Sequence, residues 1–532
     1  MQRFADLLDE LVYTQSRNGK LALLQDYFRT TPDPDRGWAL AALTDGLPLR
    51  LPLRRVITEL LSTRVDPVLF QLSRDYVGDT AETVALMWPS AALEGASGKL
   101  GLSEVVEALR ACPPAQLAAL VGSVLDRLDA RGRWAFLKLI GGAPRVGVSA
   151  RLAKTGLAMA FAREVTAIEE VWHALVPPYV ELFTWLEGRG EAPAAQGQPL
   201  FRPLMLANPI EPPDWTDLDP ADFVAEWKWD GIRVQIGAGK FRTHLYSRTG
   251  DEVSGAFPEI VDGFAGADVT LDGELLVMRS NVVAPFNDLQ QRLNRKTVSA
   301  RLVKEFPAHV RLYDMLLQGE EDLRPLPFVE RRRRLEQWHA AAGPRISDVS
   351  ELLPFADFRQ LEALRAGARA ASIEGLMLKR KASPYLAGRP RGHWFKWKRD
   401  ALTLDCVLMY AQRGSGKRSS YYSDYTFGVW RSNADGGSEL VPVGKAYFGF
   451  TDEELKELDR FIRNNTVESF GPVRAVKPSL VFEVAFDSVQ PSTRHKSGVA
   501  MRFPRIHRIR WDKPAAEADT LDAAKALIEP PP

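Results

Sequence analysis

One lysine lies between two acidic residues in a segment whose spacing could serve covalent chemistry. The segment reads Glu226-Trp-Lys-Trp-Asp-Gly-Ile-Arg233. Side chains alternate between the two faces of a strand, so a strand here would place Glu226, Lys228 and Asp230 on one face. The two tryptophans between them would then point into a core. Gly231 would let the chain turn tightly directly after the strand.

Two interpretations of Lys228 are open from this spacing alone. A lysine between carboxylates is most often one partner of an exposed ion pair, and such pairs are common and weak. The alternative is a nucleophile, although an amine reacts poorly at the ordinary lysine pKa of about 10.4. It reacts when burial, neighbouring cations or a metal ion stabilise its neutral form. A nucleophilic Lys228 therefore needs a site built from distant parts of the chain.

The rest of the chain, which must supply such a site, falls into stretches that differ in their pattern of apolar and polar residues. Residues 1–187 show apolar side chains at helical spacing, interrupted by short loops rich in Gly, Pro and Ser. The segment 187–199, rich in Gly, Ala and Gln, is interpreted as a linker. Alternating segments that predict strands follow, with helices expected at 330–342 and 358–369. From residue 401 the strands become short and the turns frequent, which suits a small β-barrel.

The bulk composition is that of a globular protein. The chain has 532 residues, 45% hydrophobic and 26% charged, which suggests about three to four domains with cores. Its net charge of +1 means that any nucleic-acid surface must be a local patch. Cys112 and Cys406 are far apart and offer neither a disulfide framework nor a zinc site. The basic run Arg331–Arg334 is predicted to be the solvated face of a helix.

The lysine segment resembles the active-site signature of the covalent nucleotidyltransferases, which include DNA ligases, RNA ligases and mRNA-capping enzymes. Further segments resemble the other motifs of this superfamily, in their order along the chain. They are Ser247–Asp251, Leu271–Leu276, Val310–Met315, Glu374–Lys379, Trp394–Asp400 and Arg502–Lys513. The last segment is similar to the C-terminal motif of DNA ligases, and the helical stretch is similar to their DNA-binding domain. The whole resembles the ATP-dependent DNA ligases of bacteria and archaea.

This resemblance implies a multidomain fold. Residues 1–195 would form an all-α DNA-binding domain, residues 196–400 an α+β nucleotidyltransferase (adenylation) domain, and residues 401–532 an OB-fold β-barrel with a C-terminal tail. The implied activity is the sealing of nicks between a 3′-hydroxyl and a 5′-phosphate, in DNA repair, replication or recombination. It would proceed through lysyl-AMP and DNA-adenylate intermediates. The implied cofactors are ATP, as donor of AMP, and Mg²⁺, for which Mn²⁺ could substitute.

The implied partner is nicked double-stranded DNA, bound by a monomer. The sequence identifies no repair-protein partner. No apolar run approaches the roughly 18 residues that a membrane-spanning helix needs, and the acidic N-terminal segment does not resemble a secretory signal. We therefore expect no membrane association and a cytoplasmic location, with nucleoid association while the protein acts.

The resemblance also implies roles for individual residues. Lys228 would be the catalytic nucleophile that accepts AMP. The residues expected around ATP or AMP are Glu226, Arg233, Arg248, Glu274, Tyr313, Arg391, Lys396 and Lys398. The expected metal ligands are Glu274 and Glu374. The residues expected to orient the pyrophosphate leaving group are Arg505, Arg510, Asp512 and Lys513.

Within the nucleotide set, Glu226 would lie near the adenine amino group and Tyr313 on the face of the ring. The two lysines of 394–398 share one face of a strand by alternation, and the resemblance places them at the α-phosphate. The arginine that often precedes them in the family is not cleanly placed. Pro390 occupies its usual position, so either Arg389 or Arg391 could serve.

Four alternatives remain to be weighed against a ligase. A capping enzyme shares the lysine motif but transfers GMP, and it would not be expected to carry the long helical N-terminal stretch. RNA ligases usually lack the C-terminal motif, and NAD-dependent ligases typically add cysteine zinc ligands that this chain does not offer. A DNA-end-binding scaffold with an inactive fold would be favoured by loss of the motif residues. Those residues are intact: Lys228, Glu274, Glu374, Lys396 and Lys398.

Overall fold

The computed structural model describes residues 1–528 except 48, 50, 90–99, 143, 194–200, 212–213, 215–217, 294, 369–372, 415–421, 433–436, 448–450 and 494. The chain divides into two compact units. One comprises Met1–Val165, Leu175–Ala192 and Ala401–Ile528, and the other comprises Thr166–Ala174 and Pro193–Asp400. A further division into three domains at residues 195 and 400 stays a prediction. No helix among the described residues is long and apolar enough to cross a membrane.

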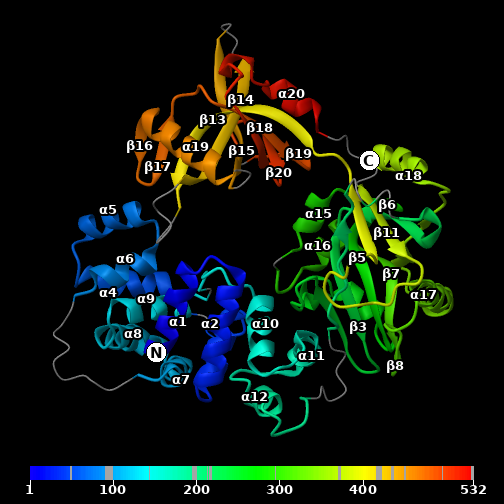
Figure 1. Cartoon of the computed structure of the whole chain (residues 1–532), viewed down its shortest axis with the longest axis horizontal. Helices are drawn as coiled ribbons and strands as arrows, with labels where there is room; N and C mark the ends of the chain where they lie inside the picture. Colours follow the sequence, from blue (N-terminus) through cyan, green and yellow to red (C-terminus); the bar gives the residue numbers. More distant parts are fainter. Residues whose placement is uncertain are drawn as a thin grey trace. The chain divides into compact units, whose positions relative to one another are not determined.

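The N-terminal stretch is helical, as its apolar spacing predicts (Figure 1). The first helix shows the cause, because Phe4, Leu7, Leu8 and Leu11 recur at helical spacing and are all buried. The helices are α1 (Gln2–Tyr13), α2 (Arg17–Thr30), α3 (Asp35–Leu43), α4 (Leu53–Ser62), α5 (Pro67–Val77), α6 (Thr80–Met87), α7 (Leu102–Ala111), α8 (Leu117–Asp126), α9 (Ala130–Ile140), α10 (Ala150–Ala160), α11 (Val165–Val171) and α12 (Val180–Leu186).

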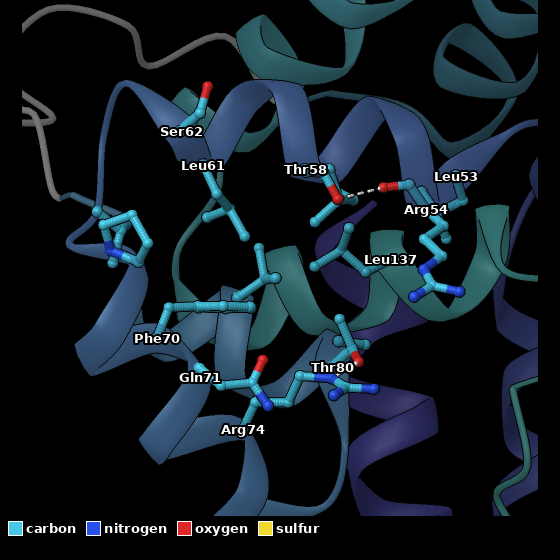
Figure 2. Close-up of a pocket in the computed structure, with 15 residues that line it drawn as sticks. Leu53, Arg54, Thr58, Leu61, Ser62, Phe70, Gln71, Arg74, Thr80 and Leu137 are labelled. Atoms are coloured by element: carbon cyan, nitrogen blue, oxygen red, sulfur yellow. Dashed lines mark hydrogen bonds between the residues drawn. The ribbon is translucent and has the colours of Figure 1, made fainter.

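A groove with apolar walls lies among helices of this stretch (Figure 2). It encloses about 650 Å³ and is lined by side chains of α4, α5, α6 and α9, including Ile57, Phe70 and Leu137. Arg54 and Arg74 are its charged lining residues. The lining contains no lysine and no carboxylate. This groove therefore lacks the groups that the predicted chemistry requires.

Two sheets form the second unit. One has the strand order β1-β12-β11-β2-β10, and the other has the order β4-β3-β5-β7-β8, with β6 paired to β5 and β9 to β7. The strands are β1 (Asn208–Pro209), β2 (Phe223–Trp229), β3 (Ile232–Ala238), β4 (Thr243–Ser247), β5 (Val269–Arg279), β6 (Val282–Val283), β7 (Ala308–Gln318), β8 (Glu321–Asp322), β9 (Ser347–Val349), β10 (Leu352–Leu353), β11 (Ile373–Arg380) and β12 (Trp394–Lys398).

Apolar clusters hold these sheets to their helices and to each other. The two longest helices are α17 (Phe328–Ala342) and α18 (Phe358–Ala366), which confirm the helices predicted there. The shorter helices are α14 (Pro258–Gly263), α15 (Phe286–Gln290) and α16 (Ala300–Glu305). One cluster joins the two sheets, because it contains Leu316 of β7, Trp394 of β12 and Val224 of β2. The inner faces of the two sheets therefore meet.

The C-terminal stretch is a curled β-rich region around one apolar core. Its first strand, β13, pairs with β14, with β18 near its beginning and with β17 near its end, which bends the sheet. The elements are β13 (Leu402–Arg413), β14 (Tyr422–Ser432), β15 (Ser438–Ala446), α19 (Asp452–Asn464), β16 (Thr466–Phe470), β17 (Val473–Val476), β18 (Val481–Phe486), β19 (Ser488–Pro491), β20 (Val499–Arg502), β21 (Arg505–Arg510) and α20 (Leu521–Ala526).

Candidate active site

The lysine segment forms β2, and its alternation follows the prediction. Trp227 packs in the apolar cluster behind the sheet, while Lys228 lies on the opposite face. The Lys228 ammonium forms an ion pair with the carboxylate of Glu374 on β11, and the two side chains are 24% and 18% exposed. The prediction that Trp229 shares the core of Trp227 is wrong, because Trp229 ends the strand and stacks against the Arg311 guanidinium of β7 at 4.2 Å. Lys228 is thus partly buried and paired.

A β-bulge turns Glu374 toward Lys228. The register between β11 and β2 shifts between Ile373 and Gly375, so Glu374 is the extra residue of the bulge. Gly375 has φ 144°, and a Cβ there would lie 2.2 Å from the carbonyl oxygen of Trp397. Only glycine fits such a position without strain. The bulge and its glycine together place the carboxylate on the lysine face.

Strand β12 brings two more lysines to the same face. In the pairing with β11, Lys396 lies opposite Met377 and Lys398 lies opposite Gly375, which is itself opposite Lys228. Lys398 Nζ is 3.4 Å from Glu374 Oε2. Burial lowers the pKa of Lys396. The positive charges that lower it further are, in order of effect, Arg389, Lys398, Lys228 and Arg248.

The positive charges around Lys396 bear on the choice between Arg389 and Arg391 as the residue that contacts the nucleotide. Arg389 has the largest electrostatic effect on Lys396 of the charged neighbours. Arg391, the residue we placed at the nucleotide from sequence, and Arg389 are both exposed in the loop before β12, so exposure does not separate them. Arg248 is exposed in the turn after β4 and adds to the same positive potential. The cluster of cations therefore includes Arg389 and Arg248.

Glu274 approaches the site from β5 of the other sheet. Burial raises its pKa to about 8, and the charges of Glu374 and Asp272 add to that shift, against the attraction of Lys228 and Arg233. A Cβ at Gly231 would lie 2.7 Å from Glu274 Cγ and 2.6 Å from the Leu275 carbonyl oxygen. Glycine is needed at 231 because β5 passes so close. The tight turn alone, which we expected from sequence, does not account for it.

Arg233 is held by buried groups on both sides. Its guanidinium donates two hydrogen bonds to the Asp272 carboxylate, at 3.0 and 2.6 Å, and a third to the Met205 carbonyl oxygen at 2.7 Å. The Tyr385 hydroxyl donates to Asp272 at 2.6 Å. Sequence reasoning assigned Arg233 to the nucleotide but missed Asp272 and Tyr385 as its anchors. These contacts fix Arg233 between the sheets before any ligand binds.

Glu226 and Tyr313 meet at the Lys379 ammonium. Lys379 Nζ lies 3.1 Å from both carboxylate oxygens of Glu226, and both side chains are 2% exposed. The same ammonium lies 4.4 Å from the centre of the Tyr313 ring. Lys379 was part of a recognised motif, yet we assigned it no role, because its spacing does not show which face it occupies. The structure brings together the two residues assigned to the adenine.

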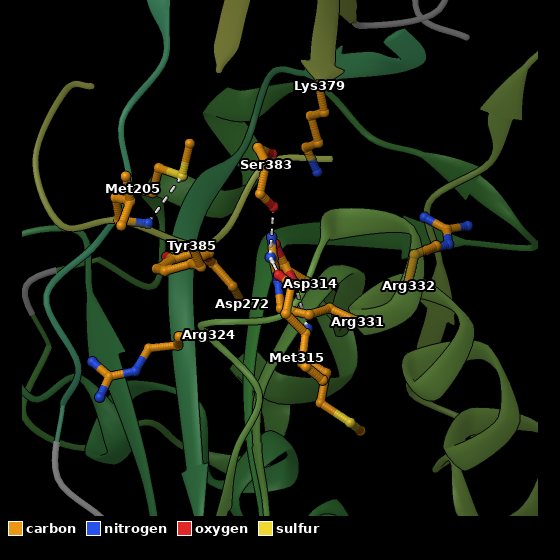
Figure 3. Close-up of polar contacts among 12 residues, drawn as sticks. Met205, Asp272, Asp314, Met315, Arg324, Arg331, Arg332, Lys379, Ser383 and Tyr385 are labelled. Carbon is orange, nitrogen blue, oxygen red and sulfur yellow. Dashed lines mark hydrogen bonds and ion pairs between the residues drawn. The ribbon is translucent and has the colours of Figure 1, made fainter. Parts of the chain in front are cut away.

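The prediction for Arg331–Arg334 is wrong for half of the run. Arg331 is fully buried, and its guanidinium forms two hydrogen bonds with Asp314, at 2.8 and 2.9 Å (Figure 3). Arg332 is also buried and lies 3.6 Å from Glu226. Arg333 and Arg334 pair with Glu330 nearer the surface. A helical period turns two consecutive residues inward, and buried carboxylates on other strands stabilise their charge.

The C-terminal motif residues lie within the curled β-rich region and pair with its own carboxylates. Arg510 donates to Asp512 at 3.0 Å through two nitrogens. Lys513 Nζ lies 2.7 Å from Asp405 Oδ2. Arg505 lies 3.7 Å from Asp487. These partners are partly exposed, so the cations remain accessible to an anionic ligand.

The carboxylates offer a partial cation site. Glu274 and Glu374 each raise the negative potential at the other, and both face Lys228. Among the described residues, no group of three or more His, Cys, Asp or Glu side chains could hold a metal ion. Two hard oxygen donors fit Mg²⁺, which keeps several waters and uses phosphate oxygens as further ligands. Two carboxylates is a number of protein ligands that suits Mg²⁺ beside phosphate oxygens.

Comparisons with known proteins agree with this arrangement. A family model described as ATP dependent DNA ligase domain matches residues 204–398, and one described as ATP dependent DNA ligase C terminal region matches residues 418–513. A probable DNA ligase of Koribacter versatilis is 34% identical over 78% of this chain and 75% of its own length. DNA ligase 1 of Korarchaeum cryptofilum is 30% identical over 99% of this chain and 98% of its own length.

One solved structure is similar along nearly the whole chain. The structure named Pmar-Lig_PreS3 has a TM-score of 0.58 and 15% sequence identity, and the match covers 95% of this chain and 99% of that one. At this identity the likeness concerns the fold alone. It supports the sequence of a helical stretch, a nucleotidyltransferase region and a β-rich C-terminal region.

Proposed function

Because the chain belongs to the ATP-dependent DNA ligases, which seal nicks in DNA with ATP, we propose that Lys228 is the residue that carries AMP. One observation carries this proposal. Strands from two sheets bring Lys228, Glu274, Glu374, Lys396 and Lys398 together on facing sides. Lys228 is partly buried, and the two lysines on its face can hold the phosphates of ATP beside its amine.

The reaction follows three displacements at phosphorus. The Lys228 amine attacks the α-phosphate of ATP, the bond to the β-phosphate breaks, and pyrophosphate leaves. A DNA 5′-phosphate then attacks the lysyl-AMP and releases the amine. The 3′-hydroxyl across the nick attacks that 5′-phosphate, a phosphodiester bond forms, and AMP leaves. Such steps depend mainly on positioning and on neutralising the charge of the phosphates.

The residues around Lys228 suit these needs. The Lys228 ammonium must lose its proton before attack, and its partner Glu374 is the carboxylate in contact with it. Lys396 and Lys398 would stabilise negative charge that develops on the α-phosphate oxygens. Burial and the neighbouring positive charges lower the pKa of Lys396, and an anion bound beside it would relieve that cost.

A magnesium ion would be held by Glu274 and Glu374, with phosphate oxygens and water as further ligands. When bound, the ion supplies positive charge that stabilises the triphosphate and its transition state. Mn²⁺ could replace it at the same oxygen ligands.

The nucleotide would lie between the sheets. Tyr313 would stack on the adenine, and Glu226 would accept a hydrogen bond from its amino group. Arg248 and Arg389 would reach the sugar and phosphates. We favour Arg389 over Arg391 because of its larger effect on Lys396. Arg233 would contribute from its fixed position beside Asp272.

The remaining parts would serve the DNA. We propose that residues 1–195 bind the duplex, that residues 196–400 carry the chemistry, and that residues 401–532 form an OB-fold that closes over the active site. The three-way pairing of β13 supports this last assignment. Closure would bring the cations of Arg505–Lys513 to the pyrophosphate, and reopening would admit nicked DNA to a monomeric enzyme.

The test is incubation of the full chain with α-labelled ATP and Mg²⁺, followed by nicked duplex DNA. We expect a covalent label from ATP and none from GTP or NAD, with transfer of the label to DNA and sealed product. The Lys228→Ala variant should take no label. Lys304→Ala, which removes an exposed lysine of α16, is the matched control and should behave as the unmodified protein. Label on the Lys228→Ala variant would refute the assignment.

A further inference from the structure

Glu226 is a buried carboxylate that faces two cations from different elements. It is 2% exposed. Lys379 of β11 contacts both of its oxygens, and Arg332 Nη1 of α17 lies 3.6 Å from Oε1. A buried carboxylate is costly to keep charged unless cations compensate it. These two cations therefore compensate the charge of the Glu226 carboxylate.

Lys379 is itself confined. Its ammonium lies between 4.4 and 4.9 Å from the ring centres of Tyr313, Trp394 and Phe328. Burial lowers the pKa of Lys379, and the charge of Glu226 opposes that shift. The Lys379 ammonium and the Glu226 carboxylate therefore each compensate the charge of the other. A second cation is therefore useful to hold the carboxylate in place when a ligand competes for its oxygens.

Arg332 is built to supply that second cation. Its Nε donates to Glu336 Oε1 at 2.6 Å, and its Nη2 donates to the carbonyl oxygen of Ser350. The residue is 6% exposed. Its Nη1 is buried and has no hydrogen-bond partner within the described part of the chain, and it is the nitrogen nearest Glu226. Two anchors thus fix the guanidinium while the remaining donor faces Glu226.

The position of this carboxylate decides which bases can bind. An ionised carboxylate only accepts hydrogen bonds. Adenine presents an amino donor at position 6, whereas guanine and hypoxanthine present a carbonyl acceptor there. A fixed carboxylate would bind the first and repel the others. A site that hydrogen-bonds its substrate can reject an analogue without the group by about 10⁴-fold or more.

We propose that Arg332 is a positioning residue that holds the Glu226 carboxylate in place as a hydrogen-bond acceptor and thereby sets the preference for nucleotides with a 6-amino group. The proposal rests on the proposed contact between Glu226 and adenine. Arg332 itself touches neither the nucleotide nor the reacting atoms. Its planar fork reaches Glu336, Ser350 and Glu226 together, which the single ammonium of a lysine does not reproduce.

The experiment measures covalent labelling of the full chain by ATP and by purine riboside triphosphate, which lacks the 6-amino group. The ratio of the two kcat/KM values reports the preference. We expect Arg332→Met to lower this ratio at least about tenfold, mainly through the KM for ATP, and Arg332→Lys to restore it only in part. Glu336→Gln weakens one of the contacts that anchor Arg332. Glu336 is half-exposed, so this variant should lower the ratio by a smaller factor.

Two controls come from the same helix. Arg331→Met removes a buried arginine that pairs with Asp314, and Arg334→Met removes one that pairs with Glu321 and Glu330 near the surface. Both should leave the ratio unchanged, even where Arg331→Met lowers the melting temperature. A structural role alone would lower stability in Arg332→Met without changing the ratio.

The outcomes are distinct. A reduced ratio in Arg332→Met, with both controls unchanged, supports the proposal. An unchanged ratio in folded Arg332→Met overturns it, and Glu336→Gln decides in the same way if Arg332→Met does not fold. An unchanged ratio in Glu226→Gln also overturns it, although labelling of Lys228 would still stand. Absence of any label on the unmodified protein would instead refute the proposed function.

Discussion

Charged pairs in the nucleotidyltransferase region and in the C-terminal region differ in burial. Asp314 and Arg331, between β7 and α17, are both fully buried. Arg510 and Asp512, at the end of β21, are 21% and 70% exposed. The first pair lies behind residues assigned to the adenine, and the second belongs to the motif assigned to pyrophosphate. The charged pair is therefore buried in the nucleotidyltransferase region and largely exposed in the C-terminal region.

The difference concerns when each charge becomes available. A buried pair is fixed before the ligand arrives, and breaking it leaves an uncompensated charge. An exposed pair contributes little to stability, and water screens it. Its cation can exchange a carboxylate for a phosphate at small cost. We infer that the nucleotidyltransferase region is preorganised, whereas the C-terminal cations act only when a phosphate replaces their partners.

The largest expected effect is on stability. Asp314→Ala leaves the Arg331 guanidinium buried without a carboxylate, which should cost about 3–5 kcal/mol in the free energy of unfolding. Equilibrium urea unfolding of the full chain measures it. Asp512→Ala is the control and should leave the unfolding transition in place. Equal losses of unfolding free energy in the two variants would contradict the proposed difference between the buried and the exposed pair.

The next effect is on rate. Lys396→Met removes a cation from the proposed phosphate site and should slow labelling of Lys228 by about 10²–10³-fold. Within the described part of the chain Lys396 forms no ion pair, so the free energy of unfolding should change little. Single-turnover labelling with α-labelled ATP measures the rate, beside Lys304→Met as control. A change below about threefold would place the α-phosphate elsewhere.

A smaller effect depends on pH. Glu274 has a pKa of about 8 in the folded protein against an ordinary 4.5, so the folded state holds a proton that the unfolded state releases between these values. Stability from this group is therefore present at low pH and falls as pH rises toward 8. Relative to Glu274→Gln, the free energy of unfolding measured in EDTA should fall by about 2 kcal/mol between pH 6 and pH 8. If the free energies of unfolding of the two proteins changed equally with pH, the raised pKa of Glu274 would be contradicted.

The smallest effect on stability belongs to the C-terminal motif. Lys513→Ala breaks a partly buried pair with Asp405, which keeps Arg510 at 3.4 Å, and we expect a loss of at most about 1 kcal/mol in the free energy of unfolding. Labelling by ATP should still slow about tenfold, because one cation is lost from the leaving group. Sealing of a nick that already carries AMP should proceed at the normal rate. A loss in sealing alone would assign Lys513 to DNA instead.

Local patterns were sufficient for the faces of the strands. Alternation in 226–229 predicts that Lys228 and Trp227 lie on opposite faces, and alternation in 394–398 predicts that Lys396 and Lys398 share one. Both predictions are confirmed, because the period of a strand is a local property. The helical and β-rich stretches follow for the same reason.

Contacts between distant segments were not accessible from these patterns. The run of arginines was predicted to be solvated, because nothing near it in sequence reveals that Asp314 and Glu226 lie beside Arg331 and Arg332. The bulge at Glu374 depends on the pairing of two strands. Such features arise from tertiary packing, which a single sequence does not display.

The site of AMP attachment is the most direct measurement of the central claim. The full chain would be incubated with ATP and Mg²⁺, digested, and mapped by mass spectrometry. We predict that the mass of one AMP lies on the peptide that contains Lys228, and on no peptide of the Lys228→Ala variant. AMP on Lys396, Lys398 or Lys379 instead would contradict the assignment of the nucleophile and the account of the site built around it.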